Sequence, residues 1–267
     1  MFHATAMRGW SAFVVVLFVA CMLFRPTSAP AESVTVRYAE GLTHGFLALR
    51  TLEGETLAEG DLTQVARGGR VTARVVFHFK DGSVHDETTV FSQAKTFRLL
   101  SEHLIQKGPS FEHPIDVLID GSTGKVTVRS TDHDGKEKVS TEHVDLPPDV
   151  ANGLIFTLLK NFGAETTQAK LAMVATTPKA RLVKLAITRE GAEPFSMGNS
   201  SRKLTHFVVK VEIGGAAGLV APLLGKQSPD IHVWILGGDA PVFVRSEGPL
   251  FYGGPVWRIE LVSPFYR

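Results

Sequence analysis

The stretch "DLPPDVANGLIFTLLKNF", Asp145–Phe162, interrupts a chain that otherwise alternates apolar and polar residues as β-strands do. Its opening, Asp145 followed by two prolines, is typical of a helix start. Apolar residues then recur every three or four positions, which predicts a helix with a broad apolar stripe. We therefore expect one helix near 147–162, which has to bury that stripe against a β-rich chain.

Alternating runs surround this helix on both sides. The sharpest hairpin is "RVTARVVFHFKDGSVHDETTVF" (70–91), in which Asp81-Gly82 fits a two-residue type I′ turn. That turn would put Phe77 and Phe79 on one face and His78 directly opposite His85. Further strand-like runs include "SVTVRYAE", "HGFLALRTLEG", "IDVLI", "KVTVRST", "KEKVSTEHVDL", "AKLAMVATT", "ARLVKLAIT", "KLTHFVVKVEI", "DIHVWIL", "APVFVRSEG" and "PVWRIELVS".

No repeat of fixed period and no linker rich in Pro, Gly and Ser divides these runs. A second long helix that could pair with the predicted one is also missing from the pattern. The fold class predicted is mainly β: a curled antiparallel meander, or half-barrel, wrapped around one central helix. It would form a single domain over residues 32–267.

The first residues are typical of a secretory signal. Arg8 is followed by the apolar run "AFVVVLFVACMLF" and then by "SAPAES", where Ala29 and Ala31 fit a small-x-small cleavage site. We expect residues 1–31 to be a signal peptide and the mature chain to be periplasmic or secreted. Lipoprotein anchoring at Cys21 is the weaker alternative, because Phe18 stands where leucine is usual and apolar residues continue after the cysteine.

Charge and cysteine content narrow the function classes. The formal net charge is +1, and removing Arg8 and Arg25 with the signal would leave −1, so nothing favours nucleic acid as a partner. Cys21 is the only cysteine of the chain, so cleavage would leave neither a disulfide nor thiolate chemistry.

The secretion signal, the meander, the proline-opened helix and the late pattern "PVFVRSEG…WRIELVSP" together resemble periplasmic lipoprotein carriers and related uncharacterised bacterial envelope proteins. These proteins have a half-barrel that encloses a helix. The resemblance implies an apolar ligand, either a lipid or a lipoprotein, held between sheet and helix. It carries over no individual binding residue.

The residues themselves indicate where such a ligand would lie. "GGAAGLVAPLLGKQSPD" (214–230) is an apolar connection too short to span a bilayer, and "GPLFYGGP" (248–255) is a second, aromatic one. The first is either a plug of the barrel end or a mobile lip at a cavity, with peripheral membrane contact through 214–226 as a further reading. The predicted ligand-binding residues are Leu154, Phe156, Leu158, Leu219, Val220, Leu223, Leu224, Phe251 and Tyr252.

Metal and catalytic signals are weak. Two imidazoles from His78 and His85 on one face are insufficient without a third ligand, so a solvated hairpin face is the preferred interpretation and neither a metal nor a cofactor is predicted. The other histidines sit singly on strands or turns, and the chain has neither a G-x-S-x-G nor an H-E-x-x-H motif.

Three hypotheses follow from this. The first is a non-catalytic envelope protein that binds an apolar ligand, namely a lipid or a lipid-modified partner. The second is a closed structural or interaction module of the envelope without a ligand. The third is a hydrolase or metal enzyme whose site is dispersed along the sequence.

Overall fold

The structure is a computed structural model that describes residues 33–131, 135–176, 179–197, 200–212 and 228–263. The chain divides into two units, Met1–Pro30 and Ala31–Arg267, and all described residues belong to the second. Their elements are β1 (Thr43–Arg50), β2 (Thr56–Arg67), β3 (Arg70–Phe79), β4 (Val84–Gln93), β5 (Phe97–Lys107), β6 (Ile115–Asp120), β7 (Lys125–Thr131), β8 (Glu137–His143), α2 (Ile155–Lys160), β9 (Gln168–Ala175), β10 (Arg181–Met197), β11 (Ser200–Glu212), β12 (Ile231–Leu236), β13 (Val242–Pro249) and β14 (Val256–Val262).

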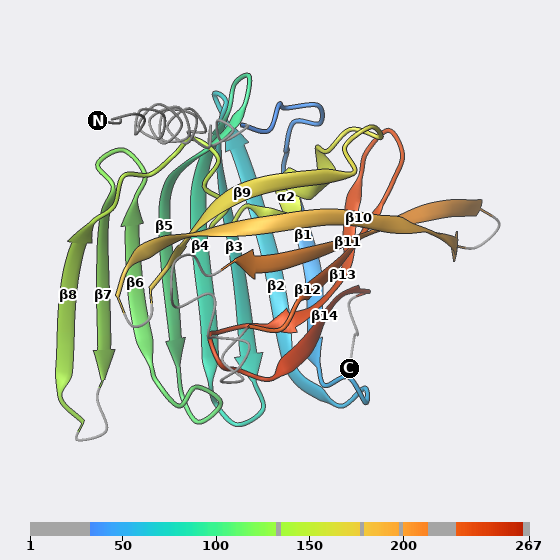
Figure 1. The fold of residues 1–267 in the computed structure, drawn as a ribbon. Coiled ribbons are helices and arrows are strands. Elements are labelled where there is room, and N and C mark those ends of the chain that lie inside the picture. The colour runs from blue at the N-terminus through green and yellow to red at the C-terminus, as the bar shows by residue number, and fades with distance from the viewer. Residues whose placement is uncertain (1–32, 132–134, 177–178, 198–199, 213–227, 264–267) are drawn as a thin grey trace, which may run out of the picture. The chain divides into compact units, whose positions relative to one another are not determined.

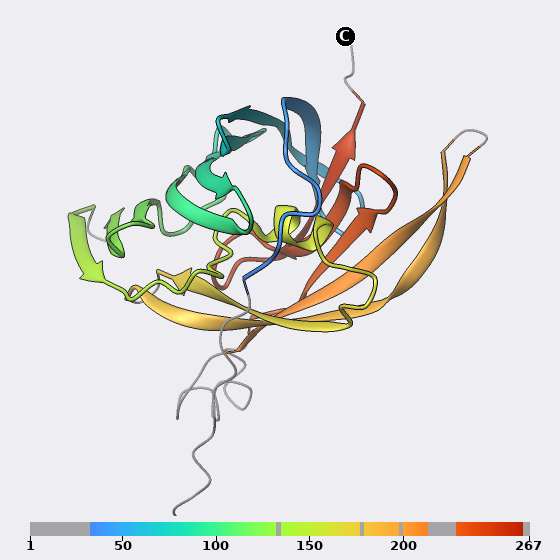
Figure 2. The same ribbon diagram turned by 90° about the horizontal axis from the view of Figure 1, so that it is seen from above.

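The strands form one antiparallel sheet in the order β8-β7-β6-β5-β4-β3-β2-β1-β14-β13-β12-β11-β10-β9. The chain runs outward from β1 to one edge at β8, crosses to the other edge at β9, and returns strand by strand until β14 pairs with β1. The sheet is curled but not closed, with α2 inside its curve (Figures 1 and 2). The predicted fold class is confirmed.

The crossing between the two edges passes through the concave side and covers the edge of β9. Val150 forms a parallel bridge with Ala172, and the Ala151 amide donates to the Ala172 carbonyl at 2.8 Å. The Asn152 side chain continues the pairing, since it accepts from the Val174 amide at 2.7 Å and donates to the Val174 carbonyl at 3.1 Å. Backbone groups of an edge strand that would otherwise lack partners are thereby satisfied.

The helix is shorter than the sequence predicted, and the predicted start at Pro147 was wrong. The residue before each proline is pushed toward extended geometry, and the chain up to Val150 is not helical. Gly153, with φ of +60°, then adopts the left-handed conformation that breaks any helix arriving from that side. Asp145 caps nothing, and α2 begins only after Leu154.

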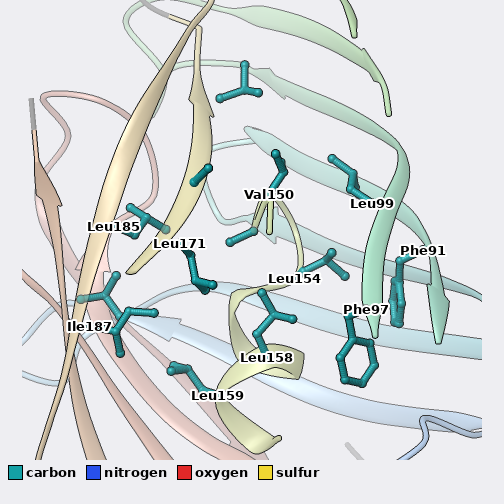
Figure 3. Close-up of a cluster of buried hydrophobic side chains, with 14 of the residues drawn as sticks. Phe91, Phe97, Leu99, Val150, Leu154, Leu158, Leu159, Leu171, Leu185 and Ile187 are labelled. Atoms are coloured by element: carbon teal, nitrogen blue, oxygen red, sulfur yellow. The ribbon is translucent and has the colours of Figure 1, made fainter. Parts of the chain in front are cut away.

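The apolar stripe is nevertheless buried as predicted. Leu154, Leu158 and Leu159 are almost fully inaccessible to solvent. They belong to one core cluster that contains residues from both halves of the sheet. Figure 3 shows Leu154 on the side of Phe97 and Phe91, and Leu159 on the side of Ile187. The helix therefore joins the two meanders through side-chain packing.

Among the described residues, no helix is long and apolar enough to cross a bilayer.

The 70–91 hairpin departs from its predicted register by one residue. Its loop has three residues, Lys80 to Gly82, with Gly82 at φ +85° and the Phe79 amide donating to the Ser83 carbonyl at 2.9 Å. His85 consequently lies opposite Phe77, and His78 lies opposite Val84. A one-residue slip moves a side chain to the other face of a sheet. The predicted apposition of His78 and His85 was therefore wrong: His85 is buried inside the curl, while His78 is exposed.

We expect Leu158→Ala to lower the free energy of unfolding by about 2–5 kcal/mol, because it removes buried methyl groups at the junction of the two meanders. Urea denaturation followed by circular dichroism measures this. Leu182→Ala is the matched control, since Leu182 is 38% exposed and its loss should cost much less. Equal denaturation midpoints for wild type and Leu158→Ala would contradict a core position for the helix.

Candidate functional site

A cavity of about 100 Å³ lies between α2 and the strands it faces. Most of its wall is apolar, and polar groups enter from β2, β4 and the helix. The residues that line it are Leu47, Leu62, Gln64, Ala73, Val75, Phe77, Glu87, Thr89, Gly153, Phe156, Thr157, Lys160, Phe243 and Ile259. A concave apolar site with a few polar groups is the common form of a small-molecule site.

Two glutamates of neighbouring strands meet beside this cavity. Glu87 of β4 lines it, and Glu102 of β5 is buried next to Glu87. Burial and the neighbouring Glu87 charge raise the pKa of Glu102 well above its usual range. Burial opposes ionisation of Glu87, but the neighbouring His85 imidazole and a hydrogen bond from Glu102 outweigh it and lower the pKa of Glu87. The pair therefore holds one proton on Glu102 and one negative charge on Glu87.

His85 stands beside Glu87 in a fixed orientation. The Gln106 amide nitrogen donates to the Leu250 carbonyl at 3.0 Å, which identifies it as a donor, and it lies 3.1 Å from Nδ1 of His85. The imidazole Nδ1 is accordingly an acceptor, and the proton of the neutral ring is on Nε2. That Nε2 is 3.9 Å from the Glu87 carboxylate, which is an electrostatic contact and not a close hydrogen bond.

At another part of the wall, Lys160 forms an ion pair with the Glu40 carboxylate. Gln64 donates to the same carboxylate at 2.9 Å, and Gln93 donates to the Glu40 carbonyl at 2.9 Å. Both charged side chains are largely buried, so each depends on the other for compensation. Lys160 is therefore held at the wall with its charge already matched.

Gly153 allows the crossing segment to approach these polar groups. A Cβ atom built on it would lie 1.9 Å from the Thr89 hydroxyl oxygen and 3.0 Å from a Glu87 carboxylate oxygen. Its positive φ disfavours side chains as well. Only glycine fits this position, where the turn before α2 rests on β4.

The residues predicted to bind a ligand are distributed over several environments. Phe156 lines the cavity, whereas Leu154 and Leu158 belong to the core beside it. Phe251 packs edge-on against Phe111 with ring centroids 5.4 Å apart, in an aromatic cluster at the β13–β14 turn. Tyr252 is 56% exposed. Leu219, Val220, Leu223 and Leu224 lie outside the described residues.

Sequence reasoning missed the glutamate pair. The available signal was "VHDETTVF" (84–91), in which His85, Glu87, Thr89 and Phe91 alternate on one face. With a two-residue turn, His85 was placed on the solvated face, and the polar residues after it gave no hint of burial. The register set by the three-residue loop turns this whole row inward.

Two histidines that looked isolated in sequence also meet. His206 Nε2 of β11 is 2.9 Å from His232 Nδ1 of β12, and the His206 ring stacks on Trp234 at 4.6 Å. Burial and then the neighbouring His232 lower the pKa of His206. Within the described ranges, no group of three or more histidine, cysteine or acidic side chains is arranged to hold a metal ion.

No family model matches the chain, and no curated protein matches it either. Among solved structures, it is similar to the crystal structure of a beta-barrel-like protein of domain of unknown function DUF1849 from Brucella abortus. The two chains are 11% identical, the match covers 86% of this chain and 100% of the other, and the TM-score is 0.48.

We expect the proton on Glu102 to make stability depend on pH. Because its pKa is raised in the folded state, the folded chain binds more protons than the unfolded chain above the ordinary glutamate pKa. This group's contribution is complete at acidic pH and is lost as the pH rises toward the folded pKa, at no more than about 1.4 kcal/mol per pH unit.

Glu102→Gln imitates the protonated acid and should remove that component. Urea titrations across the pH range would then give a shallower decline for Glu102→Gln than for wild type, while Glu137→Gln on the exposed edge strand should follow wild type. Parallel pH profiles for wild type and Glu102→Gln would show that Glu102 does not carry the proton.

Proposed function

We propose that this protein binds an apolar ligand, a lipid or a lipid-modified partner, and that an apolar group of the ligand enters the cavity beneath α2. The observation that carries the proposal is the cavity itself, whose wall is mostly apolar and includes Phe156 and Phe243. We further propose that it acts in the periplasm or outside the cell, as the signal-like residues 1–31 indicate.

The volume of the cavity limits the size of the ligand group that can enter it. Small-molecule pockets usually measure about 300–1,000 Å³, and a dry cavity of about 150 Å³ holds one benzene ring. A cavity of about 100 Å³ therefore takes a group of roughly four or five heavy atoms. The ligand would place one end here, and a longer chain would need α2 or the neighbouring connections to move. Each buried CH₂ group would contribute about 0.8 kcal/mol.

A closed structural module is the second candidate, and one observation favours it. Leu154, Leu158 and Leu159 already fill most of the concave side, and a packed core needs no ligand. What sets the cavity apart from packing defects is its wall, where an ionised Glu87 is found. Empty cavities in protein interiors are typically lined by apolar groups.

Filling the cavity distinguishes the two candidates. Ala73 lines it from β3, so Ala73→Leu adds bulk inside the cavity without changing charge. We expect this substitution to weaken binding of a fluorescent fatty-acid probe by about tenfold or more, because the probe's end loses its apolar contacts. Ala186→Leu is the matched control: Ala186 lies between Lys170 and Lys210 on the outward face of β10 and should leave binding unchanged.

Mass spectrometry of the wild-type protein, purified from its own envelope fraction, would test for a co-purifying ligand. Absence of both probe uptake and a bound ligand would overturn the binding function and leave the closed module. Equal probe affinities in wild type and Ala73→Leu would instead show that ligands bind elsewhere.

A further inference from the structure

The wall of the cavity combines a carboxylate with aromatic rings. Phe77, Phe156 and Phe243 line it, and the rings of Phe156 and Phe243 lie 4.4 Å apart at their centroids. Glu87 lines the same space from β4. Aromatic faces carry partial negative charge and attract cations, and aromatic residues with a carboxylate form the sites that hold methylated ammonium groups.

Among the described charges around the cavity, the Glu87 carboxylate accepts a hydrogen bond from Glu102 but has no cation in close contact. Lys160 and Glu40 neutralise each other in a direct ion pair. Glu102 carries a proton, and the nearest nitrogen of His85 stays 3.9 Å from the Glu87 carboxylate. The Glu87 side chain is only 24% exposed and has no cation close to it, so it favours an occupant that brings positive charge.

We propose that the group received by the cavity is an alkylammonium group, with its charge toward Glu87 and its methyl or methylene groups against Phe77, Phe156 and Phe243. The inference rests on the proposed binding function and specifies the ligand's chemistry. A trimethylammonium group has four heavy atoms and suits the volume of about 100 Å³. It is weakly hydrated and apolar at its surface, so it also satisfies the apolar wall.

An anionic group fits this wall poorly. The one lysine that lines the cavity is already paired with Glu40, and the charge of Glu87 would repel a second carboxylate or a phosphate. A fatty acid would consequently enter with its alkyl end and keep its carboxylate outside. The negative charge at the wall therefore favours ligands with a cationic group over ligands with an anionic group when their apolar parts are alike.

Choline and its neutral carbon analogue, 3,3-dimethylbutan-1-ol, isolate the role of the charge because they have almost the same shape. In calorimetric titrations of the full chain at neutral pH, we expect choline to bind at least about tenfold more tightly than the alcohol. Glu87→Gln should abolish this preference while leaving binding of the alcohol unchanged, because only the charge at the wall is lost.

Two further variants test whether the effect is specific to Glu87 and to the aromatic wall. Glu137→Gln removes an exposed acid of edge strand β8 and should keep the wild-type preference. Phe156→Leu retains an apolar side chain without a ring and should reduce choline binding more than alcohol binding. Unchanged circular dichroism and a cooperative urea transition in Glu87→Gln would show that the fold survives. Should Glu87→Gln fail to fold, Phe156→Leu decides the question in its place.

The outcomes separate this inference from the binding function. If the alcohol binds as tightly as choline, the ammonium proposal fails and the apolar site stands. If the fatty-acid probe binds but neither compound displaces it, the ammonium proposal fails and the binding function stands; if the probe does not bind and no ligand co-purifies, both fail. Comparing free choline with phosphatidylcholine vesicles identifies the source of the group: sedimentation with vesicles that free choline inhibits indicates a lipid headgroup, while choline binding without sedimentation indicates a free small ligand. Either result supports the ammonium site.

Discussion

The packing of the crossing segment into the concave side of the sheet is the constraint on which the rest of the structure depends. The chain leaves one edge at β8 and has to reach the opposite edge at β9. It does so by pairing Val150 and Ala151 with Ala172 and by burying Leu154, Leu158 and Leu159 between the two meanders. Without this segment, an open curled sheet would expose both its apolar interior and the edge of β9.

The same crossing creates the polar site. Gly153 allows the turn before α2 to contact Thr89 and Glu87. The helix therefore lies over the part of the sheet where β4 and β5 carry Glu87 and Glu102 in place of apolar residues. Burying Glu102 and His85 beside the partly buried Glu87 costs stability that apolar residues would not. The binding role that we propose would account for that cost, since perturbed carboxyl groups beside a cavity are typical of binding and catalytic sites.

Much of the fold could be predicted from the sequence because it depends on local periodicity. The alternation of strands, the presence of a helix between them and its position inside a curled sheet all followed from apolar spacing. The length of the helix did not, since the effect of Gly153 depends on a backbone angle that the sequence leaves open. The glutamate site could not be predicted from the sequence for a related reason. One extra residue in the Lys80–Gly82 loop decides which face of the sheet His85 and Glu87 occupy, and the sequence "KDGS" is compatible with both a two-residue and a three-residue turn. Phe156 was predicted as a ligand contact and lies at the cavity, but three of the polar residues that line it, Gln64, Glu87 and Thr89, come from strands more than fifty residues away in sequence.

The central claim is that the space beneath α2 is a binding site and not a gap in the packing. The most direct measurement is a crystal structure of the protein with (2-bromoethyl)trimethylammonium, located by the anomalous signal of its bromine. We predict a peak next to Phe156 and Phe243, with the ammonium group directed toward Glu87. A well-diffracting crystal at saturating ligand in which this space is empty, or is filled by the protein's own side chains, would contradict the account.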